Sequence, residues 1–301
     1  MLQVRSVSRS FGERQVLDGV SFDVAAGRMT GFIGANGSGK TTTMRIIIGV
    51  LAAHGGTLSW RGHPVSGATR QRFGYMPEER GLYPKMKTAD QIAYLGRLHG
   101  LDPAAARRQT ADLLARLELT GHADDSVERL SLGNQQRVQI AAALVHDPVL
   151  LILDEPFSGL DPIAVETVLA TLRERARQGV PVLFSSHQLG VVERLCDDVV
   201  IISGGTVVAA GDRESLQRRL GPPRFELVVG DDAGWVRDLP EVELVELDGA
   251  RVVFDLAGGY GGGDHGGPEQ AVLAAALRRG RVRSFGPVVP SLADIFQEVI
   301  R

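Results

Sequence analysis

The sequence contains a single cysteine, Cys196, among its 301 residues. One cysteine cannot form an internal disulfide, so we expect a chain of the reducing cytoplasm. Long apolar runs are also missing. The longest, Ile46 to Ala53, is far shorter than the roughly 18 to 20 residues that cross a bilayer, and the start MLQVRSVSRSF contains no apolar signal region. We therefore expect no direct membrane insertion.

The sequence also has little excess charge and few lysines. Its formal net charge of −3 means that the chain has no excess of basic residues to neutralise phosphates, so no nucleic-acid partner is expected. Only Lys40, Lys85 and Lys87 of the 33 basic residues are lysine, which makes each lysine position informative. The length suffices for about two domains, and 44% hydrophobic residues argue against disorder.

The first two thirds of the chain combine three patterns. The first 30 residues alternate apolar and polar in two stretches, which predicts a pair of antiparallel strands. Solid apolar runs at 149–153, 180–184 and 199–202 are typical of strands buried on both faces of a parallel sheet. Residues 88–146 lack such runs and predict a mostly helical insertion, at about 84–148. Asp161, Pro162 and Gly179 mark the two ends of a helix, and Gly204-Gly205 predicts a tight hairpin.

The pattern changes after about residue 219. Three alternating stretches, RFELVVG, EVELVEL and RVVFDL, predict half-exposed strands, and helices are expected at 268–279 and 291–300. The segment 257–268 holds seven glycines and predicts a flexible loop. We therefore expect two domains, 1–219 and 220–301, the second a small α+β unit.

One glycine-rich segment carries a phosphate-binding pattern. Residues 34–41, GANGSGKT, match G-x-x-x-x-G-K-S/T, follow a predicted strand at 29–33 and open a helix. Such a loop turns its backbone N–H groups around phosphate oxygens, while the lysine reaches the terminal phosphates and the following hydroxyl ligates Mg²⁺. The candidate nucleotide-binding residues are Gly34, Asn36, Gly37, Ser38, Gly39, Lys40, Thr41 and Thr42.

Two acidic residues follow the apolar run 149–153. Ligands sit at the carboxyl ends of strands in open parallel sheets, so Asp154 and Glu155 fall at the predicted phosphate site. Asp154 is expected to hold Mg²⁺ with Thr41, and Glu155 is the candidate general base for an attacking water. Alone, the pair would fit a strand-end salt-bridge partner better than a catalytic site; the neighbouring phosphate loop reverses this and favours catalysis.

With residues 130–137, LSLGNQQR, the sequence resembles the nucleotide-binding subunit of ATP-binding cassette (ABC) transporters over about residues 1–215. This segment resembles the family signature, commonly L-S-G-G-Q. The resemblance implies a homodimer with two shared ATP sites, in which Ser131, Gly133 and Asn134 of one copy cap the γ-phosphate bound by the other. Leu132 and Asn134 depart from the commonest letters.

Further positions match the family pattern. Residues 158–161, SGLD, resemble the D-loop, and His187 sits at the switch histidine, where it is expected to contact the γ-phosphate and orient Glu155. Phe11 matches the aromatic that stacks on adenine, although a Phe in a hairpin could merely be packing. Glu78 stands where the family usually has glutamine. A carboxylate still ligates Mg²⁺ and adds negative charge near the triphosphate.

The resemblance also implies partners and a location. Residues 81–87, GLYPKMK, lie where a membrane subunit docks in the family, with a solvated loop as the alternative. The end of the chain, including PSLADIF at 290–296, resembles the accessory domain of bacterial drug and sodium exporter ATPases. We expect a cytoplasmic ATPase, peripheral on the inner face of the membrane, that powers a separately encoded permease. A soluble ABC ATPase and an ATP-gated regulatory clamp are the alternatives.

These patterns together predict an α/β fold. It consists of a P-loop NTPase core with a parallel sheet, an antiparallel β subdomain and a helical insertion, followed by the C-terminal α+β domain.

Overall fold

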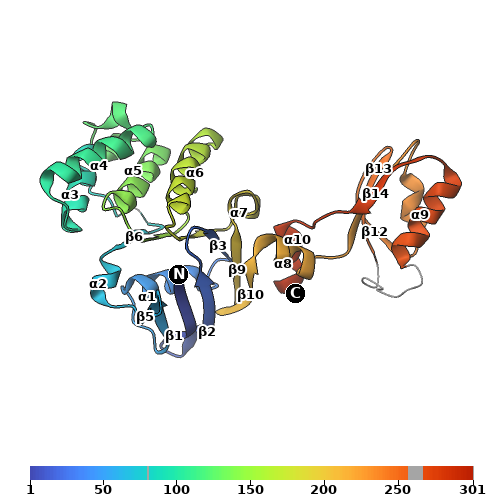
Figure 1. The fold of residues 1–301 in the computed structure, drawn as a ribbon, viewed down its shortest axis with the longest axis horizontal. Coiled ribbons are helices and arrows are strands. Elements are labelled where there is room, and N and C mark those ends of the chain that lie inside the picture. Colours follow the sequence, from blue (N-terminus) through green and yellow to red (C-terminus); the bar gives the residue numbers. More distant parts are fainter. Residues whose placement is uncertain (80, 257–266, 301) are drawn as a thin grey trace. The chain divides into compact units, whose positions relative to one another are not determined.

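The computed structural model describes residues 1–79, 81–256 and 267–300, which form two compact units (Figure 1). The first unit is Met1–Arg213, and the second begins at Glu214. The predicted boundary after residue 219 falls inside helix α8 (Arg213–Leu220), nearly all of which belongs to the second unit. The glycine-rich loop expected at 257–268 lies almost wholly outside the described residues.

An antiparallel sheet in the order β2-β1-β4-β5 occupies the N-terminal part of the first unit. The predicted pairing of the first two strands is confirmed, with Leu2 opposite Val24 and Phe11 opposite Arg14. Alternation along β1 directs Leu2, Val4 and Val7 into the core. The strands are β1 (Leu2–Phe11), β2 (Arg14–Val24), β4 (Gly55–Trp60) and β5 (His63–Pro64).

A second sheet, in the order β10-β9-β3-β8-β7-β6, forms the centre of the first unit. Its strands are β3 (Met29–Ile33), β6 (Phe73–Met76), β7 (Leu150–Leu153), β8 (Val182–Ser186), β9 (Asp198–Ser203) and β10 (Thr206–Asp212). All neighbours pair in parallel except β9 and β10, which form the predicted hairpin. Gly204 and Gly205 turn it with φ of 53° and 83°, in the left-handed region that glycine tolerates. The segments that follow β3, β6, β7 and β8 therefore meet at one edge of the sheet.

Helices flank this sheet. α1 (Lys40–Ile48) follows β3 and buries Met44, Ile46 and Ile47 in the core shared with the antiparallel sheet. The predicted helical stretch is confirmed and forms the group of helices shown in green in Figure 1. Asp161 caps α6 by accepting a hydrogen bond from Ala164 N at 2.9 Å. The remaining helices of this unit are α2 (Gly67–Arg70), α3 (Thr88–Leu98), α4 (Pro103–Arg116), α5 (Leu132–Leu144), α6 (Pro162–Arg177) and α7 (Leu189–Leu195).

The second unit contains an antiparallel sheet in the order β12-β13-β11-β14. The sequence did not single out α8 or β14, because RESLQRRL is mostly polar and VRSFGP ends in glycine and proline. Edge strand β12 is more exposed than predicted and leaves Leu244 and Val245 in solvent. The other elements are β11 (Arg224–Val229), β12 (Val242–Asp248), β13 (Arg251–Leu256), α9 (Pro268–Arg279), β14 (Val282–Pro287) and α10 (Leu292–Ile300).

Candidate functional site

The loop between β3 and α1 is shaped by glycines that have no room for a side chain. A Cβ on Gly34 would collide with Ile202 O and Ser38 Oγ. Gly39 has a φ of 109°, and a Cβ there would collide with Leu17. The glycines of the phosphate-binding pattern are therefore required by the backbone path itself, which wraps the loop around the start of α1.

Lys40, the first residue of α1, is buried with its ammonium group inside the loop. Its Nζ donates to Gly34 O at 2.7 Å and to Ala35 O at 3.2 Å. These carbonyl contacts satisfy a cation that is only 7% exposed. Ser38 Oγ, on the same loop, is buried and has no hydrogen-bond partner within the described chain. The loop thus holds a buried charged donor and a buried hydroxyl without a partner.

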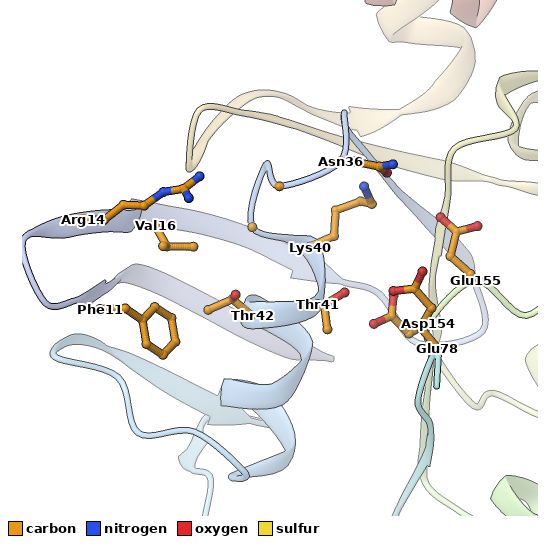
Figure 2. A pocket seen from close by; sticks show the side chains of 12 residues that line it. Phe11, Arg14, Val16, Asn36, Lys40, Thr41, Thr42, Glu78, Asp154 and Glu155 are labelled. Carbon is orange, nitrogen blue, oxygen red and sulfur yellow. The ribbon is translucent and has the colours of Figure 1, made fainter. Parts of the chain in front are cut away.

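Lys40 lines a pocket of about 370 Å³, which we call the Lys40 pocket (Figure 2); Gly34 and Ser38 are not among its described lining residues. Its lining comes from the β1–β2 hairpin, the phosphate loop with α1, and the ends of β6 and β7. Figure 2 shows Lys40 and Thr41 on one side and Glu78, Asp154 and Glu155 together on the other. The lining residues are Phe11, Arg14, Val16, Asn36, Gly37, Gly39, Lys40, Thr41, Thr42, Glu78, Asp154 and Glu155.

The acidic end of the pocket contains a buried, partly unpaired carboxylate. Asp154 is 1% exposed, and its Oδ1 accepts a hydrogen bond from Ser185 Oγ at 2.6 Å. Its Oδ2 has no partner within the part of the chain that the structure describes. Thr41 and Glu78 line the same pocket. Carboxylate and hydroxyl oxygens are the donors that Mg²⁺ prefers, so the residues present fit a magnesium ion.

Glu155 is held in place through both its backbone and its carboxylate. Its N–H donates to Ser185 Oγ at 2.8 Å, and its carbonyl accepts from Gln136 Nε2 at 3.0 Å. Its carboxylate Oε2 lies 2.9 Å from His187 Nδ1. Glu155 also adopts a φ of 52°, a strained conformation for a residue with a side chain. The sequence predicted the pair of Glu155 and His187 but gave no signal for the serine that joins Asp154 to Glu155.

Phe11 lies at the opposite end of the Lys40 pocket and is 46% exposed. The Arg9 guanidinium lies 4.9 Å from the centroid of its ring. Arg14 and Val16 line this end as well, and sequence reasoning missed both. The predicted hairpin could have indicated Arg14, because Phe11 and Arg14 are directly paired across its turn.

The signature residues lie apart from the Lys40 pocket, since Ser131, Gly133 and Asn134 are not among the described residues that line it. Ser131 caps α5 and accepts a hydrogen bond from Asn134 N at 3.2 Å. Asn134 Oδ1 in turn accepts from Arg137 Nη2. The N-terminus of α5 therefore exposes Ser131 and Leu132 to solvent and does not line the pocket of its own chain.

Two further side chains lie away from the pocket, His146 and Cys196. His146 stacks on His99 with ring centroids 3.7 Å apart, and burial, reinforced by His99, lowers the pKa of His146 to about 4. Cys196 is buried against Gly31, and burial raises the pKa of its thiol well above the usual value. Both residues belong to the first unit, where this packing gives them a structural role.

Comparison with known proteins gave matches along the whole chain. Residues 17–158 match the family model described as ABC transporter, and residues 211–300 match that of the ATP-binding protein DrrA1-3-like, C-terminal domain. The chain is 38% identical over 300 residues to the uncharacterized ABC transporter ATP-binding protein YhaQ of Bacillus subtilis, covering 100% of this chain and 98% of YhaQ.

Two further similarities are informative. Nod factor export ATP-binding protein I of Cupriavidus metallidurans is 34% identical over 303 residues, covering 98% of this chain and 96% of the relative. A solved structure of the ATP binding subunit of an ABC transporter superposes with a TM-score of 0.68 at 34% identity, covering 73% of this chain and 92% of the other. Within the described residues, no helix is both long and apolar enough to cross a membrane.

Proposed function

The chain belongs to the family of ABC transporter ATP-binding proteins, and on that basis we propose that it hydrolyses ATP in the Lys40 pocket to drive export through a separately encoded membrane permease. The observation that carries this proposal is the hydrogen bond between His187 and Glu155 beside the phosphate loop. An acceptor for the proton of water, its orienting partner and a phosphate cradle are thereby assembled at one place.

ATP binding is assigned to the loop and to the hairpin end of the pocket. Phosphate oxygens would replace the loop carbonyls as partners of Lys40 Nζ, and they would meet the N–H groups at the start of α1. Gly34, Asn36, Gly37, Ser38, Gly39 and Thr42 complete this cradle. Phe11 would stack on adenine, and its exposed ring leaves room for that contact.

Thr41, Glu78 and Asp154 would hold Mg²⁺, which when bound neutralises part of the triphosphate charge. The unpaired Oδ2 of Asp154 supports this assignment, because a buried carboxylate oxygen without a partner is costly unless a cation or water satisfies it. Ser185 fixes the orientation of Asp154 by donating to its other oxygen.

Hydrolysis is assigned to Glu155 acting as general base. Its carboxylate would accept a proton from water while the water oxygen bonds to the γ-phosphorus and the bond to the ADP oxygen breaks. His187 would orient this carboxylate and contact the γ-phosphate. Most of the catalytic effect then comes from positioning, since the backbone of Glu155 is anchored on both sides.

A second copy of the chain is needed to complete each site in this proposal. Ser131, Gly133 and Asn134 lie outside the Lys40 pocket of their own chain, and the N-terminus of α5 faces solvent. Backbone N–H groups at a helix start bind anions, so this surface suits the γ-phosphate held by a partner copy. The proposed assembly is a homodimer with two shared ATP sites.

The proposals of a permease partner and of export are based on the names of the relatives. The name of the Cupriavidus relative includes Nod factor export, and the second unit matches a DrrA-like domain. Residues 81–87, which include the half-exposed Tyr83, are the proposed docking segment. The chain would then be a cytoplasmic subunit held at the inner face of the membrane through its permease.

Steady-state phosphate release from the purified full-length chain tests this function. We expect release that needs ATP and Mg²⁺ and that is lost in Lys40→Ala together with ATP binding. A control, Lys85→Ala, removes a lysine outside the pocket and should hydrolyse ATP like wild type. Unchanged ATP affinity in Lys40→Ala would contradict the assignment of the pocket. Stimulation by membranes that contain the permease tests the coupling to transport.

A further inference from the structure

The Lys40 pocket carries a second carboxylate at its metal end. Strands β6 and β7 pair in parallel with Met76 opposite Leu153, and Asp154 N donates to Met76 O at 2.9 Å. This register brings the residues that follow both strands to the same edge of the sheet. Glu78 and Asp154 consequently line one pocket together with Thr41 (Figure 2).

The charges of the pocket do not balance. Among the residues that the structure describes, its lining contains three carboxylates, Glu78, Asp154 and Glu155, and two cations, Lys40 and Arg14. Among the described residues, neither Glu78 nor Asp154 forms an ion pair, and Asp154 Oδ2 is buried without any partner. Arg14 lies at the other end of the pocket, beside Phe11 (Figure 2). The described side chains at the metal end are therefore negative before any ligand binds.

We propose that Glu78 makes a divalent cation a precondition for nucleotide binding: the cation binds to the nucleotide-free protein between Thr41, Glu78 and Asp154, and ATP without a metal is repelled. This inference rests on the proposed function of the same pocket. It concerns the order of binding, which the ATPase assignment leaves open.

The physical reason is the difference between a carboxylate and an amide. Glutamate and glutamine have the same length and shape, so exchanging them changes the charge with little change in packing. With two carboxylates and one hydroxyl, the cation already has anionic ligands that do not come from nucleotide. A triphosphate that arrives without a cation meets the same two charges. Asp154 is buried, so its repulsion is screened less than in bulk water, and Glu78 adds an exposed negative charge at the mouth of the same pocket. One residue thus strengthens metal binding and weakens binding of metal-free ATP.

Glu78→Gln should change two affinities in opposite directions: that for Mn²⁺ and that for metal-free nucleotide. Binding of Mn²⁺ to the nucleotide-free protein, followed by loss of the electron paramagnetic resonance signal of the free ion, should weaken roughly tenfold. Binding of trinitrophenyl-ATP in EDTA should instead tighten, by roughly threefold or more. Glu79→Gln is the matched control, because it removes the same charge from the next residue, which is exposed like Glu78 but does not line the pocket. It should behave like wild type in both assays.

Two results would overturn the inference. One is equal Mn²⁺ affinity in wild type and Glu78→Gln; the other is equal affinity of the two proteins for trinitrophenyl-ATP in EDTA. The Lys40→Ala variant separates this failure from failure of the proposed function. If Lys40→Ala loses nucleotide in the presence of metal while Glu78→Gln behaves like wild type, only the binding order is wrong. If Lys40→Ala keeps full nucleotide affinity, the pocket assignment itself fails.

Discussion

His187 Nδ1 lies 2.9 Å from Glu155 Oε2, and this contact joins the segments that follow two adjacent parallel strands. Strand β7 leads into Glu155 and β8 leads into His187, with Leu153 opposite Phe184 in the sheet. Glu155 is 9% exposed and held in a left-handed backbone conformation, so its carboxylate has little freedom to move away. The position of this carboxylate is set by the sheet, as the proposed role of proton acceptor requires.

Replacement of Glu155 by glutamine should separate binding from hydrolysis. Glutamine keeps the shape of the side chain but does not accept a proton from water at neutral pH. We expect ATP affinity close to wild type and a turnover that falls by several orders of magnitude. Nucleotide binding and phosphate release measured on the same preparation check this. Near-normal hydrolysis would remove Glu155 from the role of base.

Ser185→Ala should affect stability as well as turnover. Its hydroxyl donates to Asp154 and accepts from Glu155 N, so alanine leaves two buried polar groups without a partner. We expect a loss of about 2 to 4 kcal/mol in the free energy of unfolding, with reduced hydrolysis. Ser186→Ala is the control, because it loses a single contact, from Gln188 N, and should cost about 1 kcal/mol.

Unfolding of the first unit can be followed separately for this comparison. Trp60 lies in that unit and Trp235 in the second, so Trp60 fluorescence in a Trp235→Phe background reports on the first unit alone. Urea titrations of Ser185→Ala and Ser186→Ala in this background give the two losses. A loss for Ser185→Ala no greater than that for Ser186→Ala would show that the serine bridge is not structurally important.

Arg14→Ala should weaken ATP binding without abolishing it. Arg14 lines the Lys40 pocket from the tip of the β1–β2 hairpin, and an exposed cation there adds a modest, salt-screened attraction for a polyanion. We expect an affinity roughly fivefold lower at low salt and a smaller difference at high salt. Arg61→Ala removes an arginine that stacks on Trp60 outside the pocket and is the control. Equal affinities for the two variants would argue against a role for Arg14.

The pH dependence of stability should contain a contribution from His146. Burial and the stacked His99 lower its pKa from 6.5 to about 4, so the unfolded chain binds this proton more readily than the folded chain. This histidine therefore does not reduce the free energy of unfolding above pH 6.5. As the pH falls from 6.5 toward 4, protonation of the unfolded chain lowers that free energy. Between pH 7 and pH 5, wild type should lose up to about 2 kcal/mol more than His146→Gln. Urea titrations at both pH values test this, with the exposed His63→Gln expected to follow wild type.

Local sequence patterns predicted much of the first unit. The motif at residues 34–41 places Lys40 at the start of α1, and the apolar runs that end before Asp154 and His187 are β7 and β8. These predictions succeeded because helix starts and doubly buried strands depend on neighbouring residues. In the second unit, α8 was missed because a mostly polar segment gives little periodic signal.

Features that depend on contacts between distant segments were not predictable. Ser185 joins Asp154 to Glu155 only because β8 lies beside β7, and a serine at a strand end gives no such signal in sequence. Arg14 and Val16 enter the pocket because the hairpin folds next to α1. The unpaired oxygen of Asp154 likewise depends on burial by several elements. Each of these requires tertiary structure.

Mixing two inactive variants tests most directly the central claim that each ATP site is shared by two copies. Lys40→Ala damages the pocket and Ser131→Arg damages the capping surface, so each variant alone should hydrolyse ATP very slowly. In a mixed dimer, the intact pocket of one copy faces the intact Ser131 of the other, and phosphate release should rise well above the sum of the separate preparations. If the mixture is no more active than that sum, or if Ser131→Arg alone hydrolyses ATP at the wild-type rate, the sites are not shared.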